Sequence, residues 1–390
     1  MSWMEEFRDF AAREALPLLE ALVAAPSINP PGREDLAARP LAEFLERHGV
    51  PIEWQETEPG RPNVIGTVVG GSPGPSLALC SHLDVVPPGS PEHWSSDPFA
   101  PRLEAGRLYG RGTCDAKGSL AAMAVAVAFW ARRGLGRGRL ALAAVCGEER
   151  GGTGAKHLVA SGFRAEGAII GEPTGMQVQV GHKGRIQVTI RVRGVGGHAS
   201  QPAAAVNPIP RLAQILERLQ LLAAEVGERH HPLIGTASLA PTQVSSGDTN
   251  AATIPAMVTL VLDRRLLPGE THAAATEEIR SALADLSEVE VDCYQGAFPY
   301  LLEEDHPVVQ ACLAGIESAT GTTSRPGGFP ATCDQYILGG AGIPTTILGP
   351  GDIVRNRLHA PDEFIEITDV ETAALAYAAT ARAYLEACEK

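Results

Sequence analysis

The chain has 390 residues, 44% of them hydrophobic and 20% charged, so it can fill large cores and does not have the composition of a disordered protein. Because this length exceeds one ordinary core, we expect two domains. The formal net charge of −14 argues against a nucleic-acid or anionic-membrane partner, since either would require a basic surface.

The N-terminal segment, the longest apolar stretch and the cysteine content together predict a cytoplasmic protein. Residues 1–24 carry acidic side chains where a secretory signal peptide would carry basic ones, and they are predicted to form an amphipathic helix. The longest apolar stretch, 119–131, is shorter than the roughly 20 residues that cross a bilayer, so we interpret it as a buried helix. Seven cysteines, an odd number without a CxxC pair, indicate reduced thiols.

Short apolar segments alternate with helical patterns through the first 182 residues, and the same texture returns in residues 295–390. We expect strands and helices in this order: strands at 63–70 and 76–81, a helix near 117–133, a strand at 139–147, a helix near 152–161, a strand at 167–171, a helix near 306–319, an apolar segment at 343–351 and a final helix near 368–387. This alternation is typical of an α/β domain whose mostly parallel sheet is covered by helices.

The segment 183–294 has a different pattern. Residues 184–194 and 255–266 alternate polar and apolar side chains, as half-exposed antiparallel strands do. Helices are predicted at 207–225 and 271–286, followed by a strand at 289–294. This β-α-β-β-α-β-like order suits a small two-layer α+β domain inserted into the α/β domain.

Titratable side chains follow five of the apolar segments. They are His82 with Asp84, then Asp115, then Glu148 with Glu149, then Glu172, and finally His359. A single such residue is more commonly part of a solvated pair or a turn. Because ligands bind at the C-terminal edge of an open α/β sheet, five of them together indicate one site.

The residue types favour a metal site of hydrolytic character. Two histidines with several carboxylates, and no thiolate at a ligand-like position, favour Zn²⁺ or a similar divalent ion. His82 and Asp84 share a face of an extended backbone. We therefore expect the Asp84 carboxylate to accept a hydrogen bond from the ring nitrogen of His82 that does not bind metal. Glu148 and Glu149 follow Gly147 at a strand end, where one can bind metal and the other can act on water.

Eight motifs then connect the chain to a known family. They are HLDVVP, W…DPF, LYGRGTCDAKG, GEE, GEPT, GGHAS.P, DRRLLPGE and HAPDE, in this order from about residue 80 to 364. Taken together, they resemble the M20 metallopeptidase family, which contains acetylornithine deacetylase, succinyl-diaminopimelate desuccinylase, aminoacylase-1 and glutamate carboxypeptidases. The resemblance covers essentially the whole chain.

The resemblance implies two zinc ions, with Co²⁺ or Mn²⁺ as alternatives, bridged by Asp115. His82 and Glu172 would complete the ligands of one ion, and Glu149 and His359 those of the other. Two-metal sites suit hydrolysis because they lower the pKa of bound water and polarise a carbonyl. Glu148 matches the general base of the family.

The resemblance also assigns the inserted domain, which matches the lid and dimerisation domain of a homodimer. His198 matches a histidine that reaches across the dimer to the tetrahedral oxyanion, and Arg265 matches an arginine that binds a substrate carboxylate. Strand alternation should send the adjacent Arg264 to the opposite face. One departure is that Ala252 stands where relatives usually have asparagine, which leaves Asn250 as the candidate substrate contact.

The sequence therefore predicts a cytoplasmic, homodimeric, two-zinc amidohydrolase. Its substrate would be an N-acyl amino acid or a short peptide-like amide with a free carboxylate, as in the acetylornithine deacetylase and desuccinylase branch. A dipeptidase or carboxypeptidase of the same family is the alternative. A non-catalytic metal-binding homologue is a further one, which the intact Glu148 and ligand positions disfavour. A serine or cysteine hydrolase is disfavoured because Cys114 and Cys333 have no histidine placed by the sequence and no GxSxG motif exists.

Overall fold

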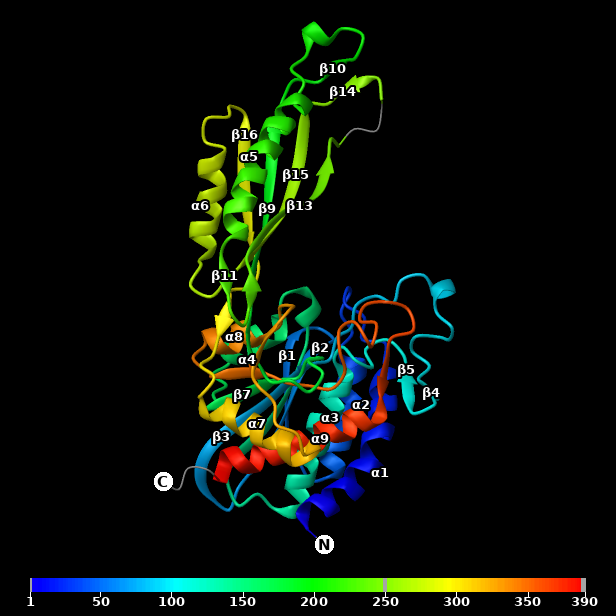
Figure 1. Cartoon of the computed structure of the whole chain (residues 1–390). Helices are drawn as coiled ribbons and strands as arrows, with labels where there is room; N and C mark the ends of the chain where they lie inside the picture. Colours follow the sequence, from blue (N-terminus) through cyan, green and yellow to red (C-terminus); the bar gives the residue numbers. More distant parts are fainter. Residues whose placement is uncertain (1, 248–250, 387–390) are drawn as a thin grey trace. The chain divides into compact units, whose positions relative to one another are not determined.

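The computed structural model describes residues 2–247 and 251–386, and the chain divides into two compact units (Figure 1). Unit 1 comprises Met1–Gly181, Leu302–Phe329 and Cys333–Lys390, and unit 2 comprises His182–Leu301 and Pro330–Thr332. The insertion expected at 183–294 lies within unit 2, which extends further, to Leu301, and includes three residues from a distant loop. Among the described helices, none is both long and apolar enough to cross a membrane.

Unit 1 is built on a mixed sheet with strand order β1-β2-β6-β3-β7-β19-β8. The strands are β1 (Ile52–Glu58), β2 (Arg61–Val69), β3 (Ser72–His82), β6 (Arg137–Val145), β7 (Gly167–Ile170), β8 (Gln179–His182) and β19 (Thr345–Ile347), with β18 (Gly327–Phe329) paired to β8. The central strands β6, β3, β7 and β19 are parallel, whereas β1, β2 and β8 pair antiparallel at the flanks. The predicted parallel α/β sheet is confirmed for the strands at its centre.

Two groups of helices cover this sheet. The helices of unit 1 are α1 (Trp3–Val23), α2 (Asp35–Arg47), α3 (Lys117–Arg133), α4 (Thr153–Ala160), α7 (Pro307–Thr320), α8 (Gln335–Gly340) and α9 (Ile367–Glu386). Helices α3 and α9 pack together against β3 and β6, with α1 and α7 beside them, while α4 and α8 contact each other and lie against β6 and β19 respectively. The alanine-rich α3 is buried from Lys117 to Trp130, as expected for a helix inside the core.

The centre of the sheet sets the position of three of the expected site segments. His82 is the last residue of β3, Glu148 follows β6 and Glu172 follows β7. Because β6, β3 and β7 are neighbouring parallel strands, their carboxyl ends lie side by side at one edge.

Asp115 reaches this edge by another route. The strand before it, β5 (Arg107–Tyr109), belongs to a separate three-stranded sheet with β4 (Arg102–Glu104) and β20 (Phe364–Glu366). Asp115 itself stands just before α3, after a turn. The start of a helix therefore carries Asp115, which agrees with the helix expected near 117–133. The Asp115–Ala116 peptide bond is cis.

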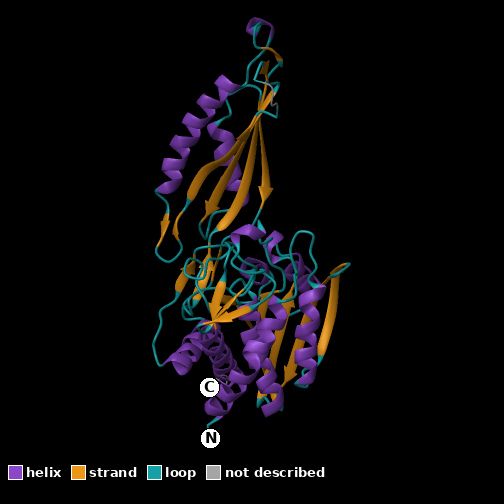
Figure 2. Cartoon of the chain, turned by 90° about the vertical axis from the view of Figure 1, so that its right-hand side faces the viewer, coloured by secondary structure: helices purple, strands orange, loops and turns teal. Residues whose placement is uncertain are grey.

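Unit 2 is a two-layer α+β structure. Along the chain it runs β9 (Gly184–Arg193), α5 (Ile209–Gly227), β13 (Ser238–Ser245), β15 (Met257–Leu266), α6 (His272–Ala282) and β16 (Val289–Gln295). This confirms the predicted β-α-β-β-α-β order, although the sequence did not locate β13. The sheet order is β13-β15-β9-β16, all antiparallel, and both helices lie on one side of the strands (Figure 2).

Alternation along the strands of unit 2 divides the sheet into a buried and an open face. Ile186, Val188 and Ile190 of β9 pack against Ile215 and Leu219 of α5. The side chains between them point to the face without helices. Short two-residue strands complete the chain: β10 (Gly197–His198) with β14 (Thr253–Ile254), β11 (His230–His231) with β12 (Gly235–Thr236), and β17 (Tyr300–Leu301).

Candidate metal centre

Asp115 lies between the two histidines that the sequence proposed as ligands. Its Oδ1 is 3.1 Å from Nε2 of His82, and its Oδ2 is 3.0 Å from Nε2 of His359. Each carboxylate oxygen thus faces a different imidazole. His359 adopts a left-handed backbone conformation with φ of 57°, which is uncommon for a residue other than glycine. This arrangement suits a carboxylate that bridges two cations.

Three glutamates surround this pair of contacts. Oε1 of Glu149 is 3.4 Å from Nε2 of His359, and Oε1 of Glu172 is 3.9 Å from Nε2 of His82. Two sets of three residues could each hold a metal ion, because the ligand atoms within each set lie within 4.8 Å of one another. One set is His82, Asp115 and Glu149, and the other is His82, Glu148 and Glu172. The structure therefore brings all six proposed metal-site residues together, Glu148 included.

The electrostatics of the site call for a cation. Burial raises the pKa of Glu148 well above the usual carboxyl range, and the negative charge of Glu172 raises it further. The pKa of Glu172 is raised in the same way by burial and by Asp115. By contrast, burial of Asp115 is outweighed by its hydrogen bonds to the two histidines, which lower its pKa. So many desolvated carboxylates repel one another, and nitrogen and oxygen donors in this geometry fit divalent ions such as Zn²⁺.

Asp84 has a different role in the geometry from the one expected. Nδ1 of His82 lies 2.9 Å from the main-chain oxygen of Asp84 and 3.6 Å from its Oδ1, so the carbonyl is the nearer acceptor. The carboxylate instead accepts the main-chain N–H groups of Glu148 and Glu149, at 3.1 and 3.2 Å. Asn29 donates to the same carboxylate at 2.9 Å. The ring of His82 is thus oriented by residue 84, as expected, but chiefly through its backbone.

Sequence reasoning missed three buried side chains at this edge. Oε1 of Glu363 accepts the main-chain N–H groups of Cys114 and Asp115, at 3.0 and 3.2 Å, and Glu363 is paired with buried Arg111. Glu363 stands in the HAPDE motif, four residues after His359, so the motif itself was the available signal.

The other two missed residues had weaker signals. Asn29 lies in the N-terminal segment, ahead of two prolines. Asp334 is almost fully buried, and burial raises its pKa to about 7, with the charge of Asp84 adding to the shift and that of His82 opposing it. No local pattern in the sequence marks an isolated aspartate as buried.

The remaining proposed site residues belong to unit 2. His198 is exposed on β10, and its Nδ1 accepts the main-chain N–H of Ser200 at 3.1 Å. Arg265 is partly exposed on β15, whereas Arg264 is buried and paired with Glu270, which agrees with the expected alternation. Asn250 lies outside the described residues.

Comparison with known proteins decides the family. A model of peptidase family M20/M25/M40 matches residues 78–383. The chain belongs to this family. It is 30% identical over 390 residues to a succinyl-diaminopimelate desuccinylase from Methylobacterium sp. (strain 4-46), covering 95% of this chain and 96% of that protein. It is 32% identical over 345 residues to an acetylornithine deacetylase from Vibrio atlanticus, covering 85% and 86%.

Solved structures of M20 proteins share the fold. A metallo-carboxypeptidase from Sulfolobus solfataricus superposes with a TM-score of 0.79 at 20% identity, over 95% of this chain and 99% of that one. A dinuclear metal-binding peptidase from Bacillus subtilis gives 0.70 at 17% identity, over 97% and 99%. Family membership makes this chain a metal-dependent hydrolase of amide or peptide bonds, as the motifs predicted.

Replacing Asp84 by asparagine tests its contacts with the turn after β6. In Asp84→Asn an amide group replaces one acceptor oxygen, so a buried main-chain N–H is left unpaired, and we expect a loss of about 2–4 kcal/mol in the free energy of unfolding. Urea unfolding of chelator-treated protein measures this without any contribution from metal. The exposed Asp305→Asn is the matched control and should change stability by less than about 0.5 kcal/mol. Equal stability of the two variants would contradict the assigned contacts.

Metal binding should release protons. Without metal, hydrogen bonds to Asp115 and Glu149 raise the pKa of His359 to about 10, so the ring is protonated at neutral pH and must lose its proton to bind a cation. Apparent metal affinity should therefore rise with pH up to about pH 10.

Titration calorimetry with Zn²⁺ at pH 7.5, in buffers of different ionisation enthalpy, counts the released protons. We expect at least one for the unmodified chain and about one fewer for His359→Ala. His93→Ala, on the surface, should match the unmodified chain. A binding enthalpy that does not depend on the buffer would refute the protonated state of His359.

Proposed function

We propose that this chain is a two-metal amidohydrolase that removes the acyl group from N-acyl amino acids. The observation that carries the proposal is the position of Asp115, whose two oxygens face His82 and His359. Glu149 and Glu172 lie beside the two histidines, one near each. Zn²⁺ fits these donors, with Co²⁺ or Mn²⁺ as alternatives. The dinuclear relative from Bacillus subtilis supports the same number of ions.

The choice of substrate class rests on the sequence relatives. The desuccinylase and the deacetylase are each at least 30% identical to this chain over most of its length. Both names describe removal of an acyl group from the amine of an amino-acid substrate. Dipeptidase activity is the second candidate, because human carnosine dipeptidase 1 shares the fold with a TM-score of 0.74. That likeness, at 16% identity, supports the fold more than the substrate.

The chemistry expected of the side chains follows from their positions. When bound, the ions would supply Lewis-acid activation of a water molecule and of the substrate carbonyl. Glu148 would accept a proton from the attacking water and later deliver it to the leaving amine nitrogen. Burial raises the pKa of Glu148, which makes it a stronger base than an exposed glutamate. Asp84 holds the main chain of Glu148 and thereby the direction of its side chain.

His198 is suited to stabilise the oxyanion. Because its Nδ1 accepts the N–H of Ser200, the neutral ring carries its proton on Nε2. Nε2–H is then a donor for a developing negative charge. We propose that this donor serves the active site of the partner subunit, as the resemblance to M20 enzymes implies.

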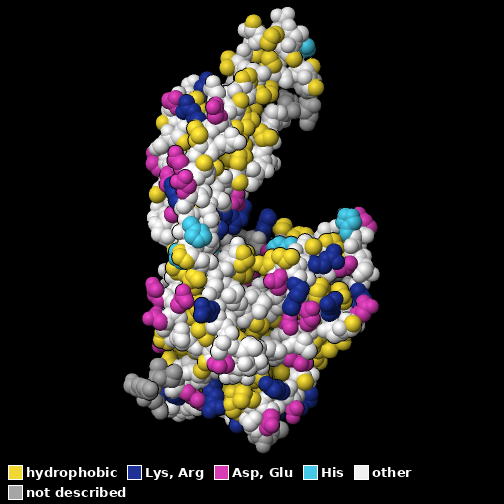
Figure 3. All heavy atoms as spheres, in the orientation of Figure 1, with side chains coloured by type: hydrophobic (Ala, Val, Ile, Leu, Met, Phe, Trp, Pro, Cys, Tyr) yellow, Lys and Arg dark blue, Asp and Glu magenta, His cyan; other side chains and the backbone are white. Residues whose placement is uncertain are grey.

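A homodimer through unit 2 is part of this proposal. Strand β13 is an edge of its sheet, and hydrophobic side chains gather on the face of unit 2 seen in Figure 3. The exposed ones in this unit include Val206, Ile209, Leu221 and Val244. An unpaired strand edge beside exposed apolar side chains is a common site of association. The six described cysteines are free, which fits the cytoplasmic location that we propose.

Substitution of the proposed base separates catalysis from metal binding. Glu148→Gln keeps the shape of the side chain but cannot accept the proton, so kcat for an N-acetyl or N-succinyl amino acid should fall by about 10²–10⁴-fold. Metal content, measured by mass spectrometry, should stay at the unmodified value, and the exposed Glu303→Gln should retain full activity. Loss of metal in Glu148→Gln would make Glu148 a ligand instead, and full activity after complete chelation would refute the metal mechanism.

Mixed dimers test whether His198 acts across subunits. His198→Ala and Glu148→Gln should each have little activity alone. Two affinity tags allow purification of a mixed dimer that contains one chain of each variant. If His198 serves the partner subunit, this dimer has one complete site and should show about half of the activity of the unmodified dimer. Activity no higher than that of the single variants would show that His198 acts within its own subunit.

A further inference from the structure

Two arginines face each other across strands β9 and β15 on the open face of unit 2. In the register of this antiparallel pair, Arg265 lies directly opposite Arg185. Like charges in directly opposed positions destabilise a sheet. Asp263 partly relieves this repulsion, because its Oδ2 accepts from Nε of Arg185 at 2.6 Å and its Oδ1 accepts from Nε of Arg265 at 2.7 Å. One carboxylate is therefore shared between two guanidinium groups.

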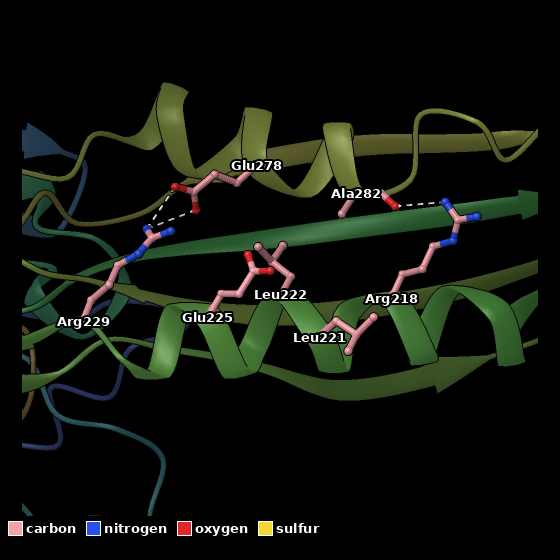
Figure 4. Close-up of a pocket in the computed structure, with 7 residues that line it drawn as sticks. All are labelled: Arg218, Leu221, Leu222, Glu225, Arg229, Glu278 and Ala282. Carbon is pink, nitrogen blue, oxygen red and sulfur yellow. Dashed lines mark hydrogen bonds and ion pairs between the residues drawn. The ribbon is translucent and has the colours of Figure 1, made fainter.

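Four other arginines of unit 2 have carboxylates of their own. On β9, Arg191 pairs with Asp292, and Arg193 pairs with Glu290 at 2.6 Å. The cations of the groove between α5 and α6 are likewise neutralised. Figure 4 shows Arg229 beside Glu278 at one end of this groove, and Arg218, at the other, is paired with Asp285. Incomplete neutralisation thus distinguishes the Arg185–Arg265 pair from these four.

A third cation joins the pair in one pocket. Lys183, Arg185 and Arg265 line a pocket of about 380 Å³ together with Pro330, Ala331 and Thr332, all of them in unit 2. Within the described ranges, the ammonium group of Lys183 has no ion pair, and Asp263 is the only carboxylate paired with either arginine. Three cations and one anion leave a formal excess of two positive charges, in a protein whose net charge is −14.

The free hydrogen-bond donors are suited to carboxylates. Asp263 accepts hydrogen bonds only from Nε of each guanidinium, which leaves the terminal nitrogens of both arginines available for other partners. Nη1 of Arg265 has one long contact, 3.5 Å to Oγ1 of Thr332. Arginine forks bind carboxylates with two parallel hydrogen bonds, and a lysine ammonium adds a flexible point charge.

We infer that Lys183, Arg185 and Arg265 together bind a dicarboxylate, so that the substrate carries two carboxylates on the part that occupies this pocket. The inference rests on the proposed function and on the family resemblance, which implies that Arg265 binds one substrate carboxylate. It adds Lys183 and Arg185 as determinants of specificity. Two anions compensate the excess charge, whereas a monocarboxylate leaves one positive charge unpaired. N-acylated aspartate and glutamate belong to this class, because both of their carboxylates lie on the amino-acid part.

Binding of two acids of equal length tests the inference directly. Titration calorimetry of the metal-loaded, full-length protein compares glutarate with valerate, which lacks the second carboxylate. We expect glutarate to bind at least 10-fold more tightly, and this preference to fall at least 10-fold in Lys183→Met and in Arg185→Gln. Arg185→Lys, which keeps the charge, should retain part of the preference. Arg193→Gln, on the same strand, should leave it unchanged.

Two results would overturn the inference. One is equal binding of glutarate and valerate by the unmodified protein. The other is an equal loss of glutarate and of inorganic phosphate binding in Lys183→Met, which would make the pocket a general anion site. Failure of the proposed function gives a different result, since no N-acyl amino acid would be hydrolysed while glutarate binding and its dependence on Lys183 persisted.

Discussion

The buried carboxylate of Asp84 connects three parts of unit 1 that are far apart in the sequence. It follows β3, accepts a hydrogen bond from Asn29 in the N-terminal segment, and accepts the main-chain N–H groups of Glu148 and Glu149 after β6. Burying a carboxylate is unfavourable unless its oxygens accept hydrogen bonds, so the loss of any one of these contacts would destabilise the fold around Asp84. Burial opposes ionisation of Asp84, but His82 and, to a smaller extent, these contacts outweigh it and lower its pKa. The turn that carries the proposed base is thereby held against the strand that carries the proposed ligand.

The carboxyl edge of the sheet holds several buried carboxylates whose mutual repulsion destabilises the folded protein. Glu148, Glu149 and Glu172 all have raised pKa values because burial and neighbouring carboxylates oppose their ionisation. A site that concentrates repulsion in this way departs from the rule that buried charges are paired, and such departures are typical of functional sites. Divalent cations would remove the repulsion. The same residues can therefore be unfavourable for the empty protein and favourable for the metal-dependent enzyme that family membership identifies.

Unit 2 uses its sheet differently. Its helices cover one face, so the strands can place apolar side chains in the core and leave charged ones on the open face. Arg191 and Arg193 on that face have carboxylate partners of their own. Arg185 and Arg265 depart from this pattern in the same sense as the glutamates of unit 1: their repulsion persists in the protein alone and would be relieved by a ligand of opposite charge. An acyl amino acid with two carboxylates has that charge.

The sequence by itself determined the strand ends that carry His82, Glu148 and Glu172, because apolar runs followed by polar residues mark the carboxyl edge of a parallel sheet. It also determined the family, through motifs that keep their order. The sequence did not reveal β1 or β13: the first is largely polar and the second contains Pro241 at a sheet edge, so neither has an apolar run. Only the tertiary structure decided that Asp84 holds the turn of Glu148, that Glu363 holds Asp115, and that Arg185 opposes Arg265. The physical reason is range. Asp84 and Glu148 are 64 positions apart in the sequence, and Asp115 and Glu363 are 248 apart. The pairing of Arg185 with Arg265 depends on strand register. No local sequence pattern encodes how such distant segments meet.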